Sequence, residues 1–308
     1  MKEKEEGEEL INLDEQIDTN RKKNKENHNK NNNKKIYANK RNIFLVISIF
    51  LIIFIMIYFY KKFMTILPKQ KTLIIFDFDK TLTSKDVFEE QRFLLPSREE
   101  QEELMEKLNY ENWTALMSSF YERMYELNIT ISDINDCIDK MEFTPGMIEL
   151  LKYFQINKDK YSLVILSAGH HYQVFQMLQR FNLINLFDEI ITIPSHVDNG
   201  KIIITQSHNY DCDICNVGQC KTYEYNLLID KFKKNKNIIF DKVFFFCDGL
   251  NDYCLVRNLK ENDIVFVRKG FTLYKGLYKE KMINSIKCKV NFWEDGFDII
   301  RYFKENKI

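Results

Sequence analysis

The sequence lacks a net charge and contains little cysteine. Its 45 Lys and Arg residues balance 45 Asp and Glu residues, so the overall charge gives no reason to expect a nucleic-acid partner. Seven cysteines are spread over 308 residues, and such a sparse, odd-numbered set does not predict a disulfide scaffold. We therefore expect reduced cysteines and a domain held together by a hydrophobic core, for which the 14% of aromatic residues provide material.

Residues 1–42 form a polar tail without a long hydrophobic run. Residues 1–18 are acidic, and residues 21–41 are rich in Lys and Asn. This composition cannot bury enough apolar surface to offset the entropy of folding, so we predict a disordered tail. The basic block is also compatible with a nuclear-localisation or lipid-binding patch, but its composition favours a solvated tail beside a membrane.

Residues 43–60 are apolar and uncharged, and they have about the length that spans a bilayer. Lys61 and Lys62 follow instead of a small-residue cleavage site, so we predict an uncleaved transmembrane anchor. A linker at residues 61–70 would join it to the folded domain. Basic residues flank both ends and leave the orientation open. We expect a single-pass protein of an endomembrane, with the lipid bilayer as one partner and the side of the folded domain undecided.

The remaining residues, 71–308, predict one α/β domain. Short apolar runs, typical of strands buried on both faces, alternate with stretches of helical periodicity. The runs lie at residues 73–76, 161–166, 189–193, 243–246 and 264–267. This alternation predicts a Rossmann-like parallel sheet flanked by helices. Residues 84–143 show only helical periodicity, and we interpret them as a small helical cap insert.

Carboxylates and a hydroxyl follow three of these runs. Asp77 and Asp79 are two residues apart, so in an extended chain they point the same way and can converge on one ligand. Ser167 follows the second run and can donate to a phosphate at a helix N-terminus. Asp248 follows a later run and can complete a metal site with Asp77. Like charges this close need a cation, and Mg²⁺ suits oxygen ligands beside a phosphate. Taken singly, each motif is also compatible with a loop, a helix cap or a turn.

Taken together, these residues resemble the motifs of the haloacid dehalogenase superfamily. Its D-x-D-x-T motif, its strand-end Ser or Thr and its G-D-G-x-N-D motif are matched here, with Cys247 in place of the first Gly of the last motif. The matching residues are Asp77, Asp79, Thr81, Ser167, Asp248, Asn251 and Asp252.

The resemblance implies roles for these residues. Asp77 would form an aspartyl-phosphate, and Asp79 would act as the general acid and base. Mg²⁺ would be held by Asp77, Asp248 and the backbone carbonyl of Asp79, and Ser167 would bind the substrate phosphate. Thr81, Asn251 and Asp252 are expected to contact and orient these residues without binding the substrate or the metal themselves.

A cysteine-rich segment at residues 208–221 narrows the resemblance. Its H-x3-C-x2-C-x4-C-K pattern is similar to that of phosphoethanolamine/phosphocholine phosphatases and pyridoxal-phosphate phosphatases. This match makes Lys221 the phosphate-binding lysine of the superfamily, with Lys201 as the alternative. It implies a small phosphorylated metabolite, similar to phosphoethanolamine or phosphocholine, as the substrate.

The chain also departs from that branch. Ala168 and Gly169 follow Ser167, where the branch usually has Asp next to the Ser. Pyridoxal phosphate, phosphoserine and a nucleotide therefore remain alternative substrates, and a phosphotransferase would use the same intermediate. An inactive membrane-tethered scaffold is the alternative from another class, and the intact motif residues argue against it.

The same segment offers metal ligands of a different kind. His208, Cys212, Cys215 and Cys220 have spacings compatible with a structural Zn²⁺ that would pin the loop before Lys221. Reduced cysteines packing a loop, or a redox-labile pair, are the alternatives.

Overall fold

The computed structural model describes residues 30, 45–60, 62, 67–107, 113–206, 212, 214–215, 218–279 and 282–308. They fall into two units, the first ending at Leu67 and the second running from Pro68 to Ile308. In the first unit, residues 45–60 form a helix with exposed side chains, whereas most of the predicted tail and the start of the predicted anchor lie outside the described residues. Within the described ranges, no helix combines the length and the apolar character needed to cross a bilayer.

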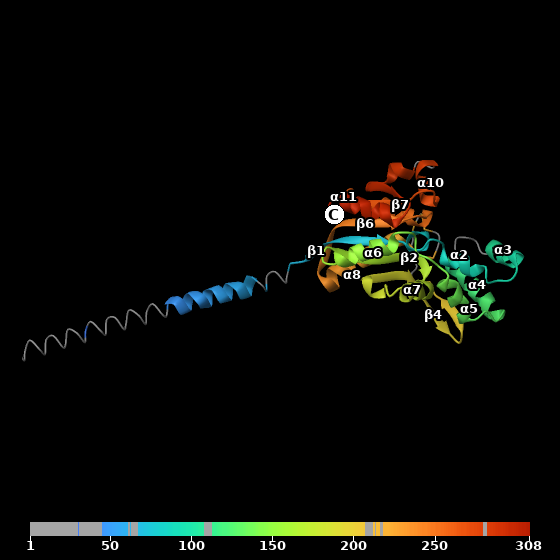
Figure 1. Ribbon diagram of the computed structural model, residues 1–308, viewed down its shortest axis with the longest axis horizontal. Helices are drawn as coiled ribbons and strands as arrows, with labels where there is room; N and C mark the ends of the chain where they lie inside the picture. The colour runs from blue at the N-terminus through green and yellow to red at the C-terminus, as the bar shows by residue number, and fades with distance from the viewer. Residues whose placement is uncertain are drawn as a thin grey trace, which may run out of the picture. The chain divides into compact units, whose positions relative to one another are not determined.

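The second unit is built on a six-stranded parallel sheet (Figure 1). The strand order is β3-β2-β1-β6-β7-β8, so β1 lies between β2 and β6. The strands are β1 (Lys69–Phe76), β2 (Tyr161–His170), β3 (Glu189–Ile193), β6 (Ile238–Cys247), β7 (Ile264–Arg268) and β8 (Lys289–Trp293). All five neighbouring pairs are parallel. The predicted α/β class with a parallel sheet is confirmed, and each predicted apolar run lies in a strand.

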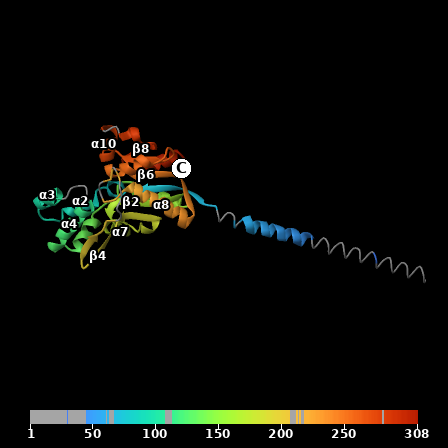
Figure 2. The same cartoon turned by 180° about the vertical axis from the view of Figure 1, so that it is seen from behind.

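Helices cover both faces of this sheet, because successive residues of each strand point to opposite faces. Ile74 and Phe76 of β1 share one core with α6 (Met147–Ile156), α7 (His171–Arg180) and α11 (Gly296–Glu305), as Figure 1 illustrates for α6 and α11. Leu73 and Ile75 share the other core with α8 (Lys221–Lys236), α9 (Tyr253–Asn258) and α10 (Thr272–Lys279). Figure 2 shows α8 on that opposite face.

Four helices occupy the described parts of the predicted insert. They are α2 (Val87–Arg92), α3 (Arg98–Lys107), α4 (Trp113–Glu126) and α5 (Ile131–Asp139). The chain enters and leaves the insert through two paired segments: Ser84 N donates to Glu142 O at 2.8 Å, and Thr144 N donates to Leu82 O at 2.8 Å. Because both connections are tied together, the insert is fixed to the sheet at its base.

A buried polar contact also joins the insert to β2. The hydroxyl of Tyr121 on α4 lies 2.7 Å from His170 Nε2, and His170 Nδ1 lies 3.0 Å from Ser195 Oγ. Burial lowers the pKa of His170 to about 3, so the imidazole is neutral at physiological pH and can be buried without a counter-charge. This contact fixes α4 against the carboxyl end of β2.

A small hairpin was missed by the sequence analysis. Strands β4 (Ser195–Asp198) and β5 (Lys201–Ile204) pair antiparallel and pack against α4. Asn199 and Gly200 between them have φ angles of 47° and 80°, as in the tight turns that Asn-Gly favours. The Asn-Gly pair was therefore a usable signal. Strand β8 was also missed, because its alternating polar residues make it unlike the continuous apolar runs of the central strands.

Candidate active site

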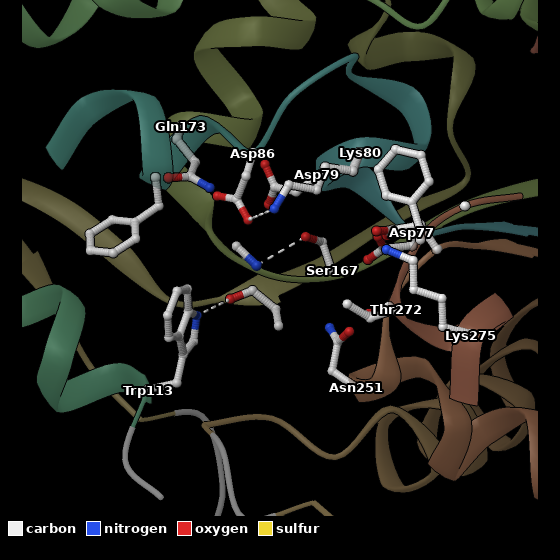
Figure 3. Close-up of a pocket in the computed structure, with 17 residues that line it drawn as sticks. Asp77, Asp79, Lys80, Asp86, Trp113, Ser167, Gln173, Asn251, Thr272 and Lys275 are labelled. Carbon is white, nitrogen blue, oxygen red and sulfur yellow. Dashed lines mark hydrogen bonds and ion pairs between the residues drawn. The ribbon is translucent and has the colours of Figure 1, made fainter. Parts of the chain in front are cut away.

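A cavity of about 530 Å³ opens where the carboxyl ends of the central strands meet (Figure 3). Asp77 follows β1, Ser167 ends the regular part of β2, and Asp248 follows β6, so three neighbouring strands deliver one side chain each. The insert contributes Phe88 and Trp113 to the wall. The cavity therefore lies between the sheet and the insert, where ligands of open parallel α/β sheets are expected.

Lys221 forms the electrostatic centre of this site. Its ammonium contacts Asp77 Oδ1 at 2.5 Å and also Asp252 Oδ1, and its side chain is only 1% exposed. Burial alone would lower the pKa of Lys221, but the carboxylates of Asp252 and Asp77 raise it above its ordinary value. The lysine is therefore charged. Asp252 is itself held in place, because Gly249 N donates to its Oδ2 at 2.9 Å.

Lys201, the alternative to Lys221, lies elsewhere. It belongs to β5 and pairs with Glu122 of α4, and it does not line the cavity. Of the two lysines, the structure brings Lys221 to Asp77.

Asp79 is positioned by the insert as well as by the strand. The chain after Asp77 forms an irregular turn in which Lys80 has a φ of 57°. Asp79 keeps extended angles there, and Val87 N at the start of α2 donates to its Oδ1 at 2.8 Å. Burial, followed by the nearby charge of Asp86, raises the pKa of Asp79 well above its usual range. A buried carboxyl of this kind can be protonated at neutral pH and donate a proton.

The backbone of β2 approaches the other site groups closely. Gly169 N donates to Ser167 Oγ at 2.9 Å. A Cβ atom on Gly169 would lie 2.6 Å from Gln173 Nε2 and 2.9 Å from Asp79 Oδ2, so no larger residue fits without displacing them. This close approach explains why glycine follows Ala168 here.

The carboxylates around Lys221 form a set that suits a hard cation. One oxygen each of Asp77, Asp248 and Asp252 lies within 4.8 Å of the others. Burial raises the pKa of Asp77 to about 6, and burial followed by the charge of Asp77 raises that of Asp248 well above its usual range. Asp252 is already engaged by Lys221 and Gly249, so Asp77 and Asp248 are better placed to bind an ion. Carboxylate oxygens beside a cavity of this kind fit Mg²⁺.

The supporting residues predicted from the sequence also gather here. Thr81 Oγ1 lies 3.5 Å from Asp248 Oδ1, and Asn251 lines the cavity. Of the predicted zinc ligands, Cys212, Cys215 and Cys220 lie together near Cys254, whereas His208 lies outside the described residues.

Several residues of the site were not predicted. Arg268 at the end of β7 donates to the backbone oxygen of Lys80, and its guanidinium lies 4.6 Å from the ring centre of Phe271. It thereby fixes the turn that carries Asp79. Lys275 lines the cavity (Figure 3). Gln173 also lines it, and its fully buried amide makes no hydrogen bond within the described part of the chain. The basic Arg268-Lys269 pair after a strand was a usable signal, but nothing marked Gln173.

Comparisons with known proteins agree with this geometry. Residues 72–306, more than half of the chain, match the family model described as "Putative Phosphatase". The chain is 29% identical over 241 residues to pyridoxal phosphate phosphatase PHOSPHO2 from Bos taurus, covering 76% of this chain and 98% of that protein. It is 22% identical over 238 residues to phosphoethanolamine/phosphocholine phosphatase from Gallus gallus, covering 76% and 88%. The resemblance predicted from the motifs is confirmed.

A solved structure supports the fold. A probable phosphoserine phosphatase from Vibrio cholerae superposes with a TM-score of 0.51 at 14% identity, covering 75% of this chain and 63% of that one.

The raised pKa of Asp248 leads to a prediction about stability. A carboxyl whose pKa is higher in the folded than in the unfolded protein opposes folding once the pH exceeds its ordinary pKa of about 4. We expect metal-free Asp248→Asn to have a higher melting temperature than the wild type at pH 7. A gain of about 1 kcal/mol in the free energy of unfolding corresponds to roughly 2–4 °C in a domain of this size. Calorimetry without and with Mg²⁺ measures this, and Mg²⁺ should stabilise the wild type but not the variant.

Asp198→Asn, at an exposed position in β4, is the matched control and should change neither quantity. A lower melting temperature for Asp248→Asn, or an undiminished response to Mg²⁺, would contradict the assignment of Asp248 to the cation site.

Proposed function

The chain belongs to this phosphatase family of the haloacid dehalogenase superfamily, and we propose that it hydrolyses a small phosphomonoester through an aspartyl-phosphate on Asp77, with Mg²⁺ as cofactor. The observation that carries the proposal is the buried contact of Lys221 with Asp77, which lines the cavity together with Asp79 and Asp248. A surface cluster of acids would lack the lysine, and a structural ion pair would lack the adjoining cavity.

The first step uses the carboxylate oxygen of Asp77 that Lys221 does not contact. Because Lys221 occupies Oδ1, Oδ2 is left to attack phosphorus, and the bond from phosphorus to the ester oxygen breaks. Asp79, protonated at the start, gives its proton to the departing oxygen. Ser167 and Lys221 donate to the phosphoryl oxygens. Asp77 and Asp248 would hold the Mg²⁺ ion, which would neutralise charge on the transferred group.

The second step returns the protein to its starting state. Asp79, now ionised, takes a proton from a water molecule, and the water oxygen attacks the phosphorus of the aspartyl-phosphate. The bond between phosphorus and Asp77 breaks, which releases inorganic phosphate and restores the Asp77 carboxylate. The hydrogen bond from Val87 N holds Asp79 in place for both proton transfers.

The insert limits the size of the substrate. Its residues Asp86, Phe88 and Trp113 line the cavity, and Trp113 Nε1 donates to Ala168 O at 3.2 Å, which joins the insert wall to β2. Figure 3 shows Asp86, Trp113 and Gln173 on one side of Ser167, and Asp77, Thr272 and Lys275 on the other. The phosphate would bind on the Asp77 side and the organic group on the insert side, which favours small esters over phosphoproteins.

Two substrate classes fit the insert side of the cavity. Two aromatic walls suit the flat ring of pyridoxal phosphate, the substrate in the name of the bovine relative. The half-buried carboxylate of Asp86, which lies 3.6 Å from the ammonium of Lys80, suits a cationic group such as that of phosphocholine or phosphoethanolamine, which the avian relative is named for. We place pyridoxal phosphate first, and phosphoserine and nucleotides serve as comparison substrates.

We also propose that residues 43–60 anchor the protein in a membrane, since they are apolar, uncharged and, from residue 45 to 60, helical with exposed side chains.

The nucleophile is tested by Asp77→Asn. Phosphate release should fall by about 1,000-fold or more, because an amide cannot form the acyl phosphate. The measurement is Mg²⁺-dependent phosphate release by the full chain, with trapping of the wild-type intermediate by hydroxylamine. Asp198→Asn should keep the wild-type rate. Full activity of Asp77→Asn would overturn the mechanism, and a folded, Mg²⁺-loaded wild type that releases no phosphate from any ester would favour the scaffold alternative.

Asp86→Asn separates the two substrate classes. Asn can still cap α2, where Asp86 now accepts from Glu89 N at 3.1 Å, so the fold should be kept. Loss of the charge should weaken binding of phosphocholine and phosphoethanolamine by about 1 kcal/mol, which raises KM for both by roughly five- to tenfold. KM for the anionic pyridoxal phosphate should be unchanged or lower. Equal changes for all esters would contradict a role of Asp86 in recognising the organic group.

The anchor is tested by fractionation of cells that express the full chain. Wild type should remain with membranes after alkaline carbonate extraction, and a Phe50→Lys, Ile53→Lys double variant should be released, because charges at the centre of a span are costly. Ile156→Lys, at a position that is 85% exposed on the catalytic domain, is the matched control and should stay with the membranes. Release of the wild type by carbonate would exclude an integral anchor.

A further inference from the structure

Four cysteines converge beside the catalytic lysine. The Sγ atoms of Cys212, Cys215, Cys220 and Cys254 all lie within 4.8 Å of one another. Cys254 Sγ lies 3.6 Å from that of Cys212 and 3.5 Å from that of Cys220. Three of the four come from the cysteine-rich segment, and the fourth comes from α9, more than thirty residues further along the chain.

The spacing of the sulfur atoms suits one tetrahedral metal ion. A zinc–sulfur bond of about 2.3 Å in a tetrahedron places the sulfur atoms about 3.8 Å apart, close to the two observed separations. A set of only thiol ligands favours Zn²⁺ over Mg²⁺, which prefers oxygen. The four atoms form one group around a common centre, which is not what two independent cysteine pairs would give.

Two polar groups contact sulfur atoms of the cluster. Cys215 N donates to Cys212 Sγ at 3.4 Å, and Thr222 Oγ1 lies 2.9 Å from Cys254 Sγ. Such outer contacts orient the ligands of a metal and stabilise the charge on sulfur.

We propose that Cys212, Cys215, Cys220 and Cys254 bind a structural Zn²⁺ that fastens the N-terminus of α8 to α9. Cys220 immediately precedes Lys221, and Cys254 comes two residues after Asp252. The ion would therefore tie together the two backbone segments whose side chains form the buried Lys221–Asp252 pair. Cys254 is the ligand that the sequence spacing did not indicate.

A bound Zn²⁺ would hold Lys221 and Asp252 at a fixed separation. Among the described residues, the thiols of Cys212 and Cys220 contact the thiol of Cys254 on α9. With the ion bound, the ammonium of Lys221 is fixed relative to Asp252 before substrate enters. The four cysteines are positioning residues in this scheme, since none of them lines the cavity.

The first measurement is the metal content of the full chain purified without chelator. We expect about one zinc ion per chain by plasma mass spectrometry. Cobalt exchanged into the same protein should give the intense sulfur-to-cobalt charge-transfer bands and visible bands of a tetrahedral thiolate site. Purified protein without zinc that also fails to bind cobalt with this spectrum would overturn the proposal, and the result does not depend on any variant folding.

Variants then identify the ligands. Cys254→Ser and Cys212→Ser should lose the zinc and the cobalt spectrum, whereas Cys137→Ser, in α5 of the insert, should retain both. Zinc retained at full stoichiometry by Cys254→Ser would overturn the assignment of the fourth ligand. Disulfides among these cysteines in the protein as purified, with no metal bound, would point to the redox-labile pair instead.

The consequence for Lys221 has its own readout. Removing zinc from the wild type should lower the melting temperature and kcat, and added Mg²⁺ should restore neither, whereas added Zn²⁺ should restore both. If zinc removal changes neither quantity, the ion does not position Lys221. Metal content and spectrum are measured without substrate, so failure of the zinc site is distinguishable from failure of the phosphatase proposal.

Discussion

The ammonium of Lys221 balances the carboxylates of Asp77 and Asp252 inside the domain, and the other groups of the site are arranged around that balance. Asp252 is fully buried and Lys221 almost so, which means that removing one partner would leave an uncompensated charge at a cost of about 3–5 kcal/mol. Three segments must therefore be placed together: the end of β1, the start of α8 and the turn after β6. The two acids that contact Lys221 also differ in their other contacts. Asp252 is held by Gly249 N and Lys221, while Asp77 keeps one oxygen directed to the cavity.

The parallel sheet explains how such distant residues can be placed with this accuracy. Phe76 and Phe246, the last core residues before Asp77 and Cys247, stack with their ring centres 4.8 Å apart on one face, so the ends of β1 and β6 are packed at a fixed separation. The insert adds a second constraint, because Val87 N at its first helix holds Asp79. The position of Asp79, the proposed proton donor, therefore depends on the insert as well as on β1.

The sequence predicted the parts of the structure that local patterns encode. Continuous apolar runs identified the central strands, since burial on both faces requires apolar residues at every position, and the strand-end acids followed from them. Strand β8 was missed because Lys289 and Asn291 interrupt its apolar residues, so it shows no continuous apolar run. Two contacts could not be predicted, because they join residues that are far apart in the sequence and brought together by the order of the strands. Arg268 contacts the carbonyl of Lys80, and Cys254 contacts the other cysteines. Spacing along the chain cannot show that α9 returns to the cysteine-rich segment.

The two metal sites inferred for this chain would have opposite effects on folding. The carboxylate cluster opposes folding when no cation is bound and the pH exceeds the ordinary carboxyl pKa, because burial raises the pKa values of Asp77 and Asp248 in the folded protein. A thiolate cluster around Zn²⁺ favours folding, since metal binding requires the folded arrangement. Cys220 and Cys254 are close in the sequence to Lys221 and Asp252, and so a bound Zn²⁺ would stabilise the region in which the buried acids oppose folding. The lysine and its two carboxylate partners would then keep their positions whether or not Mg²⁺ is bound.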